Sequence, residues 1–143
     1  MRTLLAGLGA LVLLGCAGGA VPGLMMALPT ATSAHIVAAV SDTRRPEADT
    51  VRDVLRHPAE IIAFSGVQPG WRIADVGPGG GYYSRLFSVA VGDAGRVYAI
   101  DRPGTAERPR PMGAIAPTYP NITLLSDGYQ NWTIPEPLDA IFI

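Results

Sequence analysis

The chain has 143 residues, a formal net charge of −1 from 11 basic and 12 acidic side chains, and a single cysteine, Cys16. This length allows one domain at most. The balanced charge lacks the basic stripe of a nucleic-acid-binding protein, and one cysteine excludes an internal disulfide or a cysteine-based metal site. The two histidines, His35 and His57, stand far apart without clustered acids, so no metal site is expected.

Residues 1–34 differ from the rest of the chain and are typical of an export leader. Arg2 is followed by an apolar run, and no other charged residue occurs before Asp42. This is the pattern of a secretory signal peptide, with Thr32-Ser33-Ala34 as a small-residue cleavage site. Leu13-Leu14-Gly15-Cys16 also resembles a bacterial lipobox, in which a lipidated Cys16 would attach the chain to a membrane.

This leader predicts an exported protein that is periplasmic or membrane-anchored. Pro22 and the glycines between Gly7 and Gly19 weaken a continuous membrane span, so a retained anchor ranks below secretion. A misassigned start codon is the remaining interpretation, and it would leave the protein in the cytoplasm.

Residues 35–56 are expected to form a short connector, over residues 35–45, and an N-terminal helix. Pro46 suits a first helical turn, and apolar residues recur at helical spacing from Val51 to Leu55. Pro58 then restarts a helix, and Gly66 is a suitable end for it.

A strand, a glycine loop and a helix are predicted in succession from Trp71 onwards. The apolar run Trp71–Val76 contains an acid, Asp75, and an amphipathic segment runs from Tyr82 to Val91. Between them lie Gly77, Gly79 and Gly81. Glycines at such a junction let backbone N–H groups approach a ligand closely, where a Cβ atom would block it.

A second acid, Asp101, ends the next apolar run, Arg96–Asp101. It stands at about the distance beyond the loop at which a Rossmann-type unit places its ribose-binding carboxylate. Strand, glycine loop, helix, strand and acid together predict a cofactor that contains adenosine. A glycine turn selected only for close packing is the alternative interpretation of the loop.

The glycine spacing distinguishes between cofactors. In the dinucleotide fingerprint G-x-G-x-x-G, the third glycine would fall on Tyr82 or Ser84, which disfavours a nicotinamide-dependent oxidoreductase. The pattern that fits is Asp-x-Gly-x-Gly-x-Gly, read as Asp75, Gly77, Gly79 and Gly81. It resembles motif I of the class I S-adenosylmethionine-dependent methyltransferases, and the resemblance covers residues 57–143.

The resemblance implies an α/β, Rossmann-like parallel sheet that holds the first four strands of that fold and is incomplete at the C-terminus. The third and fourth strands are expected at Ile122–Ser126 and Leu138–Ile143. The roles implied for the S-adenosyl-L-methionine site are the methionine portion for Asp75, Gly77, Gly79 and Gly81, the ribose hydroxyls for Asp101 and the adenine amino group for Asp127. Turn chemistry in Ser126-Asp127-Gly128 explains Asp127 equally well.

Between these strands the sequence is less regular. Residues 102–120 hold five prolines, so an irregular crossover with a short helical turn over Met112–Ala116 is expected. Tyr129 and Trp132 either stack on the adenine or cover the sheet end. Tyr82 and Tyr83 are expected to be packing residues.

The sequence therefore predicts the cofactor-binding half of a bacterial methyltransferase, with an unknown methyl acceptor, unknown catalytic residues and little turnover of its own. We interpret the chain as a fragment; a short natural protein that completes its sheet by dimerisation is the alternative. The leader favours a different class, an exported, non-catalytic ligand-binding or interaction protein on the same half-fold. S-adenosylmethionine is made in the cytoplasm and is not expected outside it.

Overall fold

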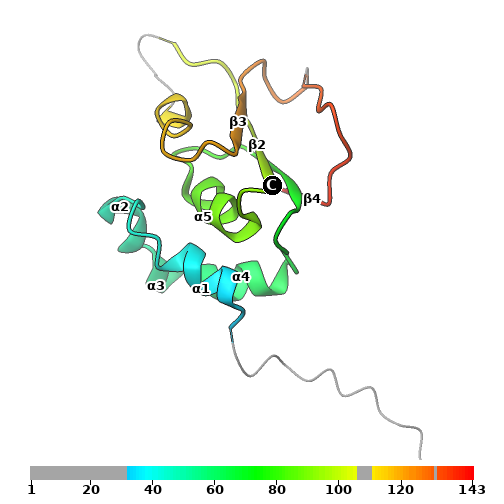
Figure 1. Ribbon diagram of the computed structural model, residues 1–143. Coiled ribbons are helices and arrows are strands. Elements are labelled where there is room, and N and C mark those ends of the chain that lie inside the picture. Colours follow the sequence, from blue (N-terminus) through cyan, green and yellow to red (C-terminus); the bar gives the residue numbers. More distant parts are fainter. Residues whose placement is uncertain (1–31, 106–110, 131) are drawn as a thin grey trace, which may run out of the picture.

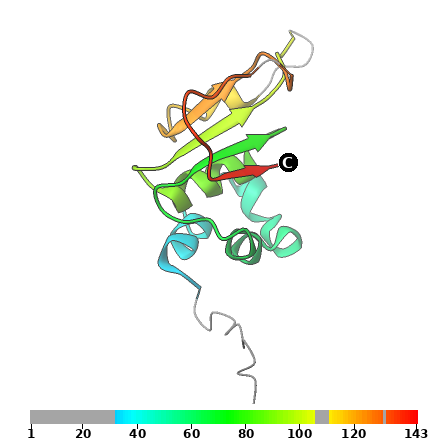
Figure 2. The same cartoon turned by 90° about the vertical axis from the view of Figure 1, so that its right-hand side faces the viewer.

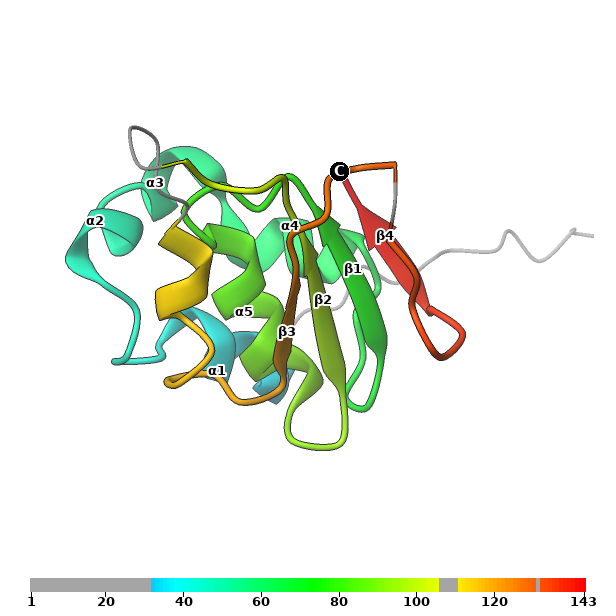
Figure 3. The same cartoon turned by 90° about the horizontal axis from the view of Figure 1, so that it is seen from above.

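The computed structural model describes residues 32–105, 111–130 and 132–143. Their core is a four-stranded parallel sheet in the order β3-β2-β1-β4. Figure 3 shows α1, α5 and the short 3₁₀ helix on the same side of this sheet, with β3 and β4 at opposite edges. The predicted α/β, Rossmann-like parallel sheet is confirmed.

The two central strands, β1 (Arg72–Val76) and β2 (Arg96–Ile100), carry most of the buried sheet residues. They pair in parallel with Ile73 opposite Val97, and both of these side chains are fully buried. The outer strands are β3 (Ile122–Leu125) and β4 (Ala140–Phe142). The strands are found where they were predicted, although β4 is shorter than the apolar run that indicated it.

Helix α5 (Tyr82–Val91) packs against β1 and β2 and forms the centre of the core. Its inward side chains, Leu86, Phe87, Ala90 and Val91, are almost completely buried. The helix begins after Gly81 and ends at Gly92, as predicted from the amphipathic pattern.

Four short helices form a second layer on α5 (Figures 1 and 2). They are α1 (Ala34–Val40), α2 (Glu47–Thr50), α3 (Asp53–Arg56) and α4 (Pro58–Phe64). The expectation of a connector over residues 35–45 was wrong in its first part. Ile36 and Ala39 lie three residues apart on one helical face, and both are buried where α1 packs on α5 and α4.

The single helix expected from Pro46 onwards is also divided, into α2 and α3. Helix α3 ends at His57, which has φ 44° and ψ 54° in the left-handed region. Because Pro58 disfavours the right-handed helical conformation in the residue before it, His57 turns the chain from α3 into α4.

The crossover between β2 and β3 contains a 3₁₀ helix, Pro111–Ala114, close to the predicted helical turn. Met112, Ile115 and Tyr119 of this segment are buried against the helical layer. The predicted leader falls almost entirely in residues 1–31, outside the described residues. Among the described helices, none is both long enough and apolar enough to cross a membrane.

Candidate functional site

The candidate site lies at the carboxyl ends of the parallel strands. The Gly77 N–H group donates to the Ile100 carbonyl oxygen at 2.9 Å, and the Asp101 N–H group donates to the Leu125 carbonyl oxygen at 2.8 Å. These bonds continue the sheet past the last residues of β1 and β2. Asp75 and the glycine loop, residues 77–81, are therefore held at the same edge of the sheet as Asp101, where open α/β sheets bind their ligands.

The glycine loop has a backbone that side chains rarely permit. Gly77, Gly79 and Gly81 have φ values of 74°, 57° and 79°. A Cβ atom on Gly79 would meet nothing within 4 Å, whereas one on Gly81 would lie 2.4 Å from Cδ1 of Ile115. Gly79 therefore borders open space, and Gly81 is required because the crossover segment packs directly against it.

Asp75 is a buried acid, with 4% of its surface exposed. The Ser84 hydroxyl donates a hydrogen bond to its Oδ2 atom at 2.5 Å. Burial raises the pKa of Asp75, the Ser84 hydrogen bond opposes this rise, and the nearby negative charge of Asp101 adds to it. Sequence reasoning missed Ser84, whose only signal was its place in the first turn of α5.

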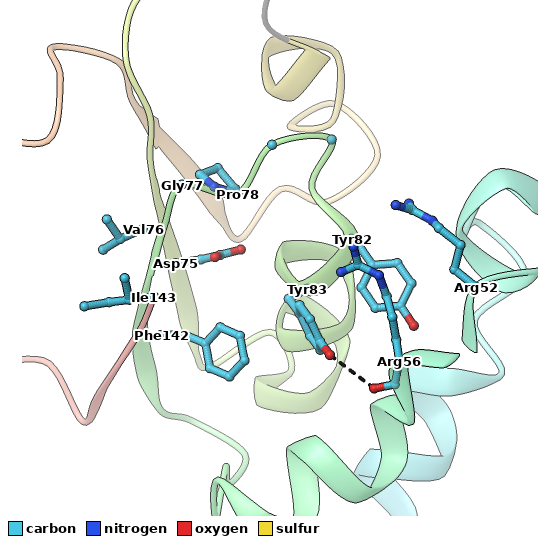
Figure 4. Close-up of a pocket in the computed structure, with 12 residues that line it drawn as sticks. Arg52, Arg56, Asp75, Val76, Gly77, Pro78, Tyr82, Tyr83, Phe142 and Ile143 are labelled. Carbon is cyan, nitrogen blue, oxygen red and sulfur yellow. Dashed lines mark hydrogen bonds between the residues drawn. The ribbon is translucent and has the colours of Figure 1, made fainter. Parts of the chain in front are cut away.

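A cavity of about 350 Å³ opens between the glycine loop and the N-terminal helices (Figure 4). In the figure, Asp75 approaches it from the end of β1, while Arg52 and Arg56 lie on the opposite side. The residues that line it are Arg52, Arg56, Asp75, Val76, Gly77, Pro78, Gly79, Gly80, Tyr82, Tyr83, Phe142 and Ile143. The structure thus brings three predicted site residues, Asp75, Gly77 and Gly79, around one cavity.

The arginines of this cavity were not among the predicted site residues. The guanidinium carbon of Arg56 lies 4.6 Å from the centroid of the Tyr82 ring, and that of Arg52 lies 5.1 Å from it. The sequence did contain a signal, because two arginines four positions apart share one face of a helical segment. Tyr82 is buried as predicted, but Tyr82 and Tyr83 also line the cavity.

Asp101 is fully buried beside this cavity without lining it. Its Oδ1 atom accepts a hydrogen bond from the Arg102 N–H group at 2.9 Å and a long one from the Tyr129 hydroxyl at 3.4 Å. Tyr129 therefore lies at the end of the sheet, directly beside the predicted ribose-binding carboxylate. Trp132 donates its indole N–H to the Tyr129 carbonyl oxygen at 3.0 Å and supports that loop.

Asp127 is placed differently from the other acids. It is exposed in the turn after β3, and the N–H group of Gly128, which has φ 93°, donates to the Asp101 carbonyl oxygen at 3.2 Å. Asp127 is thus close in sequence to the strand ends but does not line the cavity. Within the described ranges, no three His, Cys, Asp or Glu residues cluster in a way that could hold a metal ion.

Comparisons with known proteins agree with this geometry. The family model of protein-L-isoaspartate(D-aspartate) O-methyltransferase (PCMT) matches residues 49–143. Among solved structures, the chain is similar to a protein-L-isoaspartate O-methyltransferase with a TM-score of 0.49 and 24% identity, over 59% of this chain and 27% of that one. It is also similar to an S-adenosylmethionine-dependent methyltransferase from Aquifex aeolicus with a TM-score of 0.50 and 29% identity, over 63% of this chain and 48% of that one.

The chain therefore spans less than half the length of these two solved structures. A search of the curated proteins finds no significant match.

Proposed function

This chain belongs to the protein-L-isoaspartate(D-aspartate) O-methyltransferase family, and we propose that it forms the cofactor-binding half of a methyltransferase. The cofactor is S-adenosyl-L-methionine, in agreement with the family and with the similar enzyme from Aquifex aeolicus. One observation carries the proposal. A buried acid, Asp75, and an open glycine loop with positive φ angles stand beside a second buried acid, Asp101, at the ligand-binding edge of a parallel sheet.

The proposed roles follow from the chemistry of each group. The Asp75 carboxylate and the backbone of Gly77 and Gly79 hold the methionine portion, because the carboxylate accepts hydrogen bonds from an ammonium group. Asp101 accepts two hydrogen bonds from the ribose diol. Asp127, on its exposed turn, accepts from the adenine amino group, and Gly81 shapes the loop by packing.

The cofactor supplies a methyl group that is already activated on a sulfonium centre. The chain's own residues then contribute orientation and exclusion of water, since methyl transfer depends mainly on the placement of the acceptor against that methyl group. The family name specifies an acceptor, the carboxyl group of an isoaspartyl or D-aspartyl residue, and we propose it as the first acceptor to assay. We expect cofactor binding with little turnover from this chain alone.

A second candidate function, an exported ligand-binding protein, is favoured by the composition of residues 1–34. Helix α1 begins at Ala34, and its buried Ile36 and Ala39 belong to the folded core. A leader cleaved after Ala34 would therefore keep these buried side chains, but it would remove the Ser33 carbonyl oxygen that accepts hydrogen bonds from the Ile36 and Val37 N–H groups. Intact-mass measurement of the protein recovered from a bacterial host would test this, and an uncleaved chain in the cytoplasm would contradict export.

The leading proposal is tested by calorimetric titration of the full chain with S-adenosylmethionine and S-adenosylhomocysteine. Asp101→Ala should weaken both affinities by about 1–3 kcal/mol, because a buried carboxylate that accepts ligand hydrogen bonds is lost. Asp93→Ala, in the exposed turn before β2, is the matched control and should bind like the wild type. No heat from a folded sample with either ligand would contradict the proposal.

A further inference from the structure

Positive charge exceeds negative charge beside the cavity. Four guanidinium groups gather around helices α2 and α3 and the start of α5, namely Arg45, Arg52, Arg56 and Arg85, against three carboxylates, Glu47, Asp49 and Asp53. These helices and the start of α5 therefore hold one positive charge that their own acids do not neutralise.

The ion pairs identify which arginine is left over. Arg45 makes a two-pronged pair with Asp53, at 2.9 and 2.5 Å. Asp49 is shared between Arg52 and Arg85, the latter at 2.5 Å. No carboxylate among the described residues pairs with Arg56.

Arg56 is exposed, and its guanidinium group lies near two tyrosine rings. Its guanidinium group stacks near the Tyr82 ring at 4.6 Å and the Tyr83 ring at 5.9 Å, and the Tyr83 hydroxyl donates to the Arg56 carbonyl oxygen at 3.3 Å. A contact with a ring uses none of the N–H donors of a guanidinium group, so these donors can still bind a planar anion.

The free donors and the buried acid face each other. Figure 4 shows Arg52 and Arg56 on one side of the cavity and Asp75 on the other, with Tyr83 between them. We propose that Arg56, with Arg52 beside it, binds a carboxylate group in this cavity. The proposal rests on the proposed function and extends the site to the N-terminal helices, where none of the predicted site residues lies.

Two molecules of the reaction could present this carboxylate. One is the cofactor, whose methionine portion has an ammonium group for Asp75 and a carboxylate for Arg56. The other is an acceptor that carries a carboxyl group. In both cases an arginine can bind the carboxylate through two parallel hydrogen bonds.

Comparison with Arg44 distinguishes a binding role of Arg56 from a purely structural one. Arg44 also stacks on a tyrosine, 4.5 Å from the centroid of Tyr119, but it pairs with Asp42 at 2.8 Å and lies outside the cavity lining. Arg56→Gln and Arg44→Gln therefore remove the same charge from the same kind of stack. They differ in two ways: the Arg44 charge is paired with Asp42, whereas the Arg56 charge lines the cavity and pairs with no carboxylate of the described residues.

The test titrates the full chain with S-adenosylmethionine and with decarboxylated S-adenosylmethionine, which differs only in lacking the carboxylate. The wild type should bind the intact cofactor at least about tenfold more tightly. Arg56→Gln should remove this preference while leaving the affinity for the decarboxylated compound unchanged. Arg56→Lys should restore part of the preference, and Arg44→Gln should retain all of it.

A second arm examines the acceptor. An isoaspartyl peptide is titrated into the chain saturated with S-adenosylhomocysteine, and a loss of peptide affinity confined to Arg56→Gln would assign the carboxylate to the acceptor. Unchanged affinities of Arg56→Gln in both arms would overturn the proposal while the proposed function stands. If the wild type bound neither form of the cofactor, the proposed function would fail and the carboxylate site with it.

Discussion

The glycine loop and the α2–α3 segment, residues 47–56, line the same cavity but are held by different forces. The loop is fixed by its own backbone between β1 and α5, with Gly77 bonded to the Ile100 carbonyl oxygen. The α2–α3 segment is attached by side chains distant in sequence. The Tyr82 hydroxyl donates to Asp53 from 29 positions away, and Arg85 donates to Asp49 from 36 positions away.

The apolar contacts differ as well. The loop leads into a helix whose inner face is fully buried, whereas Val54 and Leu55 of α3 are 73% and 82% exposed. With so little apolar area buried, the segment depends on its ion pairs and hydrogen bonds for attachment. The glycine loop is therefore part of the folded core, whereas the α2–α3 segment is attached to that core by a few ion pairs and hydrogen bonds.

The largest expected effect comes from breaking that attachment with Asp53→Asn. The substitution leaves the Arg45 side chain, which is fully buried in this structure, without its counter-charge. We expect the free energy of unfolding to fall by about 3 kcal/mol, because a buried charge that loses its partner is strongly destabilising. Urea denaturation measures the change, and Asp93→Asn, at an exposed turn, should stay within about 0.5 kcal/mol of the wild type.

The pH dependence gives this prediction a second measurement. Burial alone would raise the pKa of Asp53, but the hydrogen bonds from Arg45 and Tyr82 outweigh it and lower the pKa below 3.8. A lowered pKa means that the carboxylate stabilises the fold above the ordinary value and that this contribution is lost as the pH falls through the folded-state value. The difference between Asp53→Asn and the wild type should therefore shrink below about pH 4. A constant difference down to pH 2 would argue against the ion pair as its source.

Two substitutions within the glycine loop distinguish a packing effect from an effect on ligand access: Gly81→Ala and Gly79→Ala. Gly81→Ala adds a Cβ atom 2.4 Å from Ile115 Cδ1 and 2.7 Å from Met112 Sδ, at a φ of 79°. We expect a stability loss of about 2 kcal/mol from strain and overpacking. Gly79→Ala meets no atom within 4 Å, so it should cost about 1 kcal/mol in backbone strain while weakening cofactor binding. Equal stability losses in both variants would show that the crossover does not pack on Gly81 as described.

The same comparison explains what could be predicted from the sequence. Strand β1, the loop and α5 follow one another directly in the sequence. Their local structure was therefore predictable from the apolar periodicity, the glycines and Asp75, without contacts from the rest of the chain. Asp101 was predictable because a parallel neighbour ends at the same edge of the sheet. Residues 34–40 escaped prediction because their helix is stabilised mainly by packing on α5, a tertiary contact.

Arg52, Arg56 and Ser84 were missed for a related reason. Each contacts a partner that only the fold brings near: Arg52 and Arg56 contact the Tyr82 ring, and Ser84 contacts Asp75. Arginines four positions apart are common on solvated helices, so their spacing alone did not indicate a cavity wall. Asp127 was indicated by its motif position alone; the structure places it in an exposed turn, and its role toward the adenine stays a prediction.

The smallest expected effect, a gain in stability, comes from Asp75→Asn. Burial raises the pKa of this acid and Asp101 adds to the rise, so the ionised form costs stability at neutral pH. A raised pKa means that stability is lost as the pH rises through the folded-state value, whereas below 3.8 the acid is protonated in both states and costs nothing. Asparagine still accepts the Ser84 hydrogen bond without the charge, so we expect a gain of about 0.5–1 kcal/mol at pH 7 that disappears at pH 3.

Urea denaturation at both pH values measures this gain, and calorimetry should show weaker cofactor binding in the same variant. A variant that is less stable at pH 7 and binds the cofactor normally would instead mean that the Asp75 charge stabilises the glycine loop. The glycine loop would then depend on charge as much as the α2–α3 segment does.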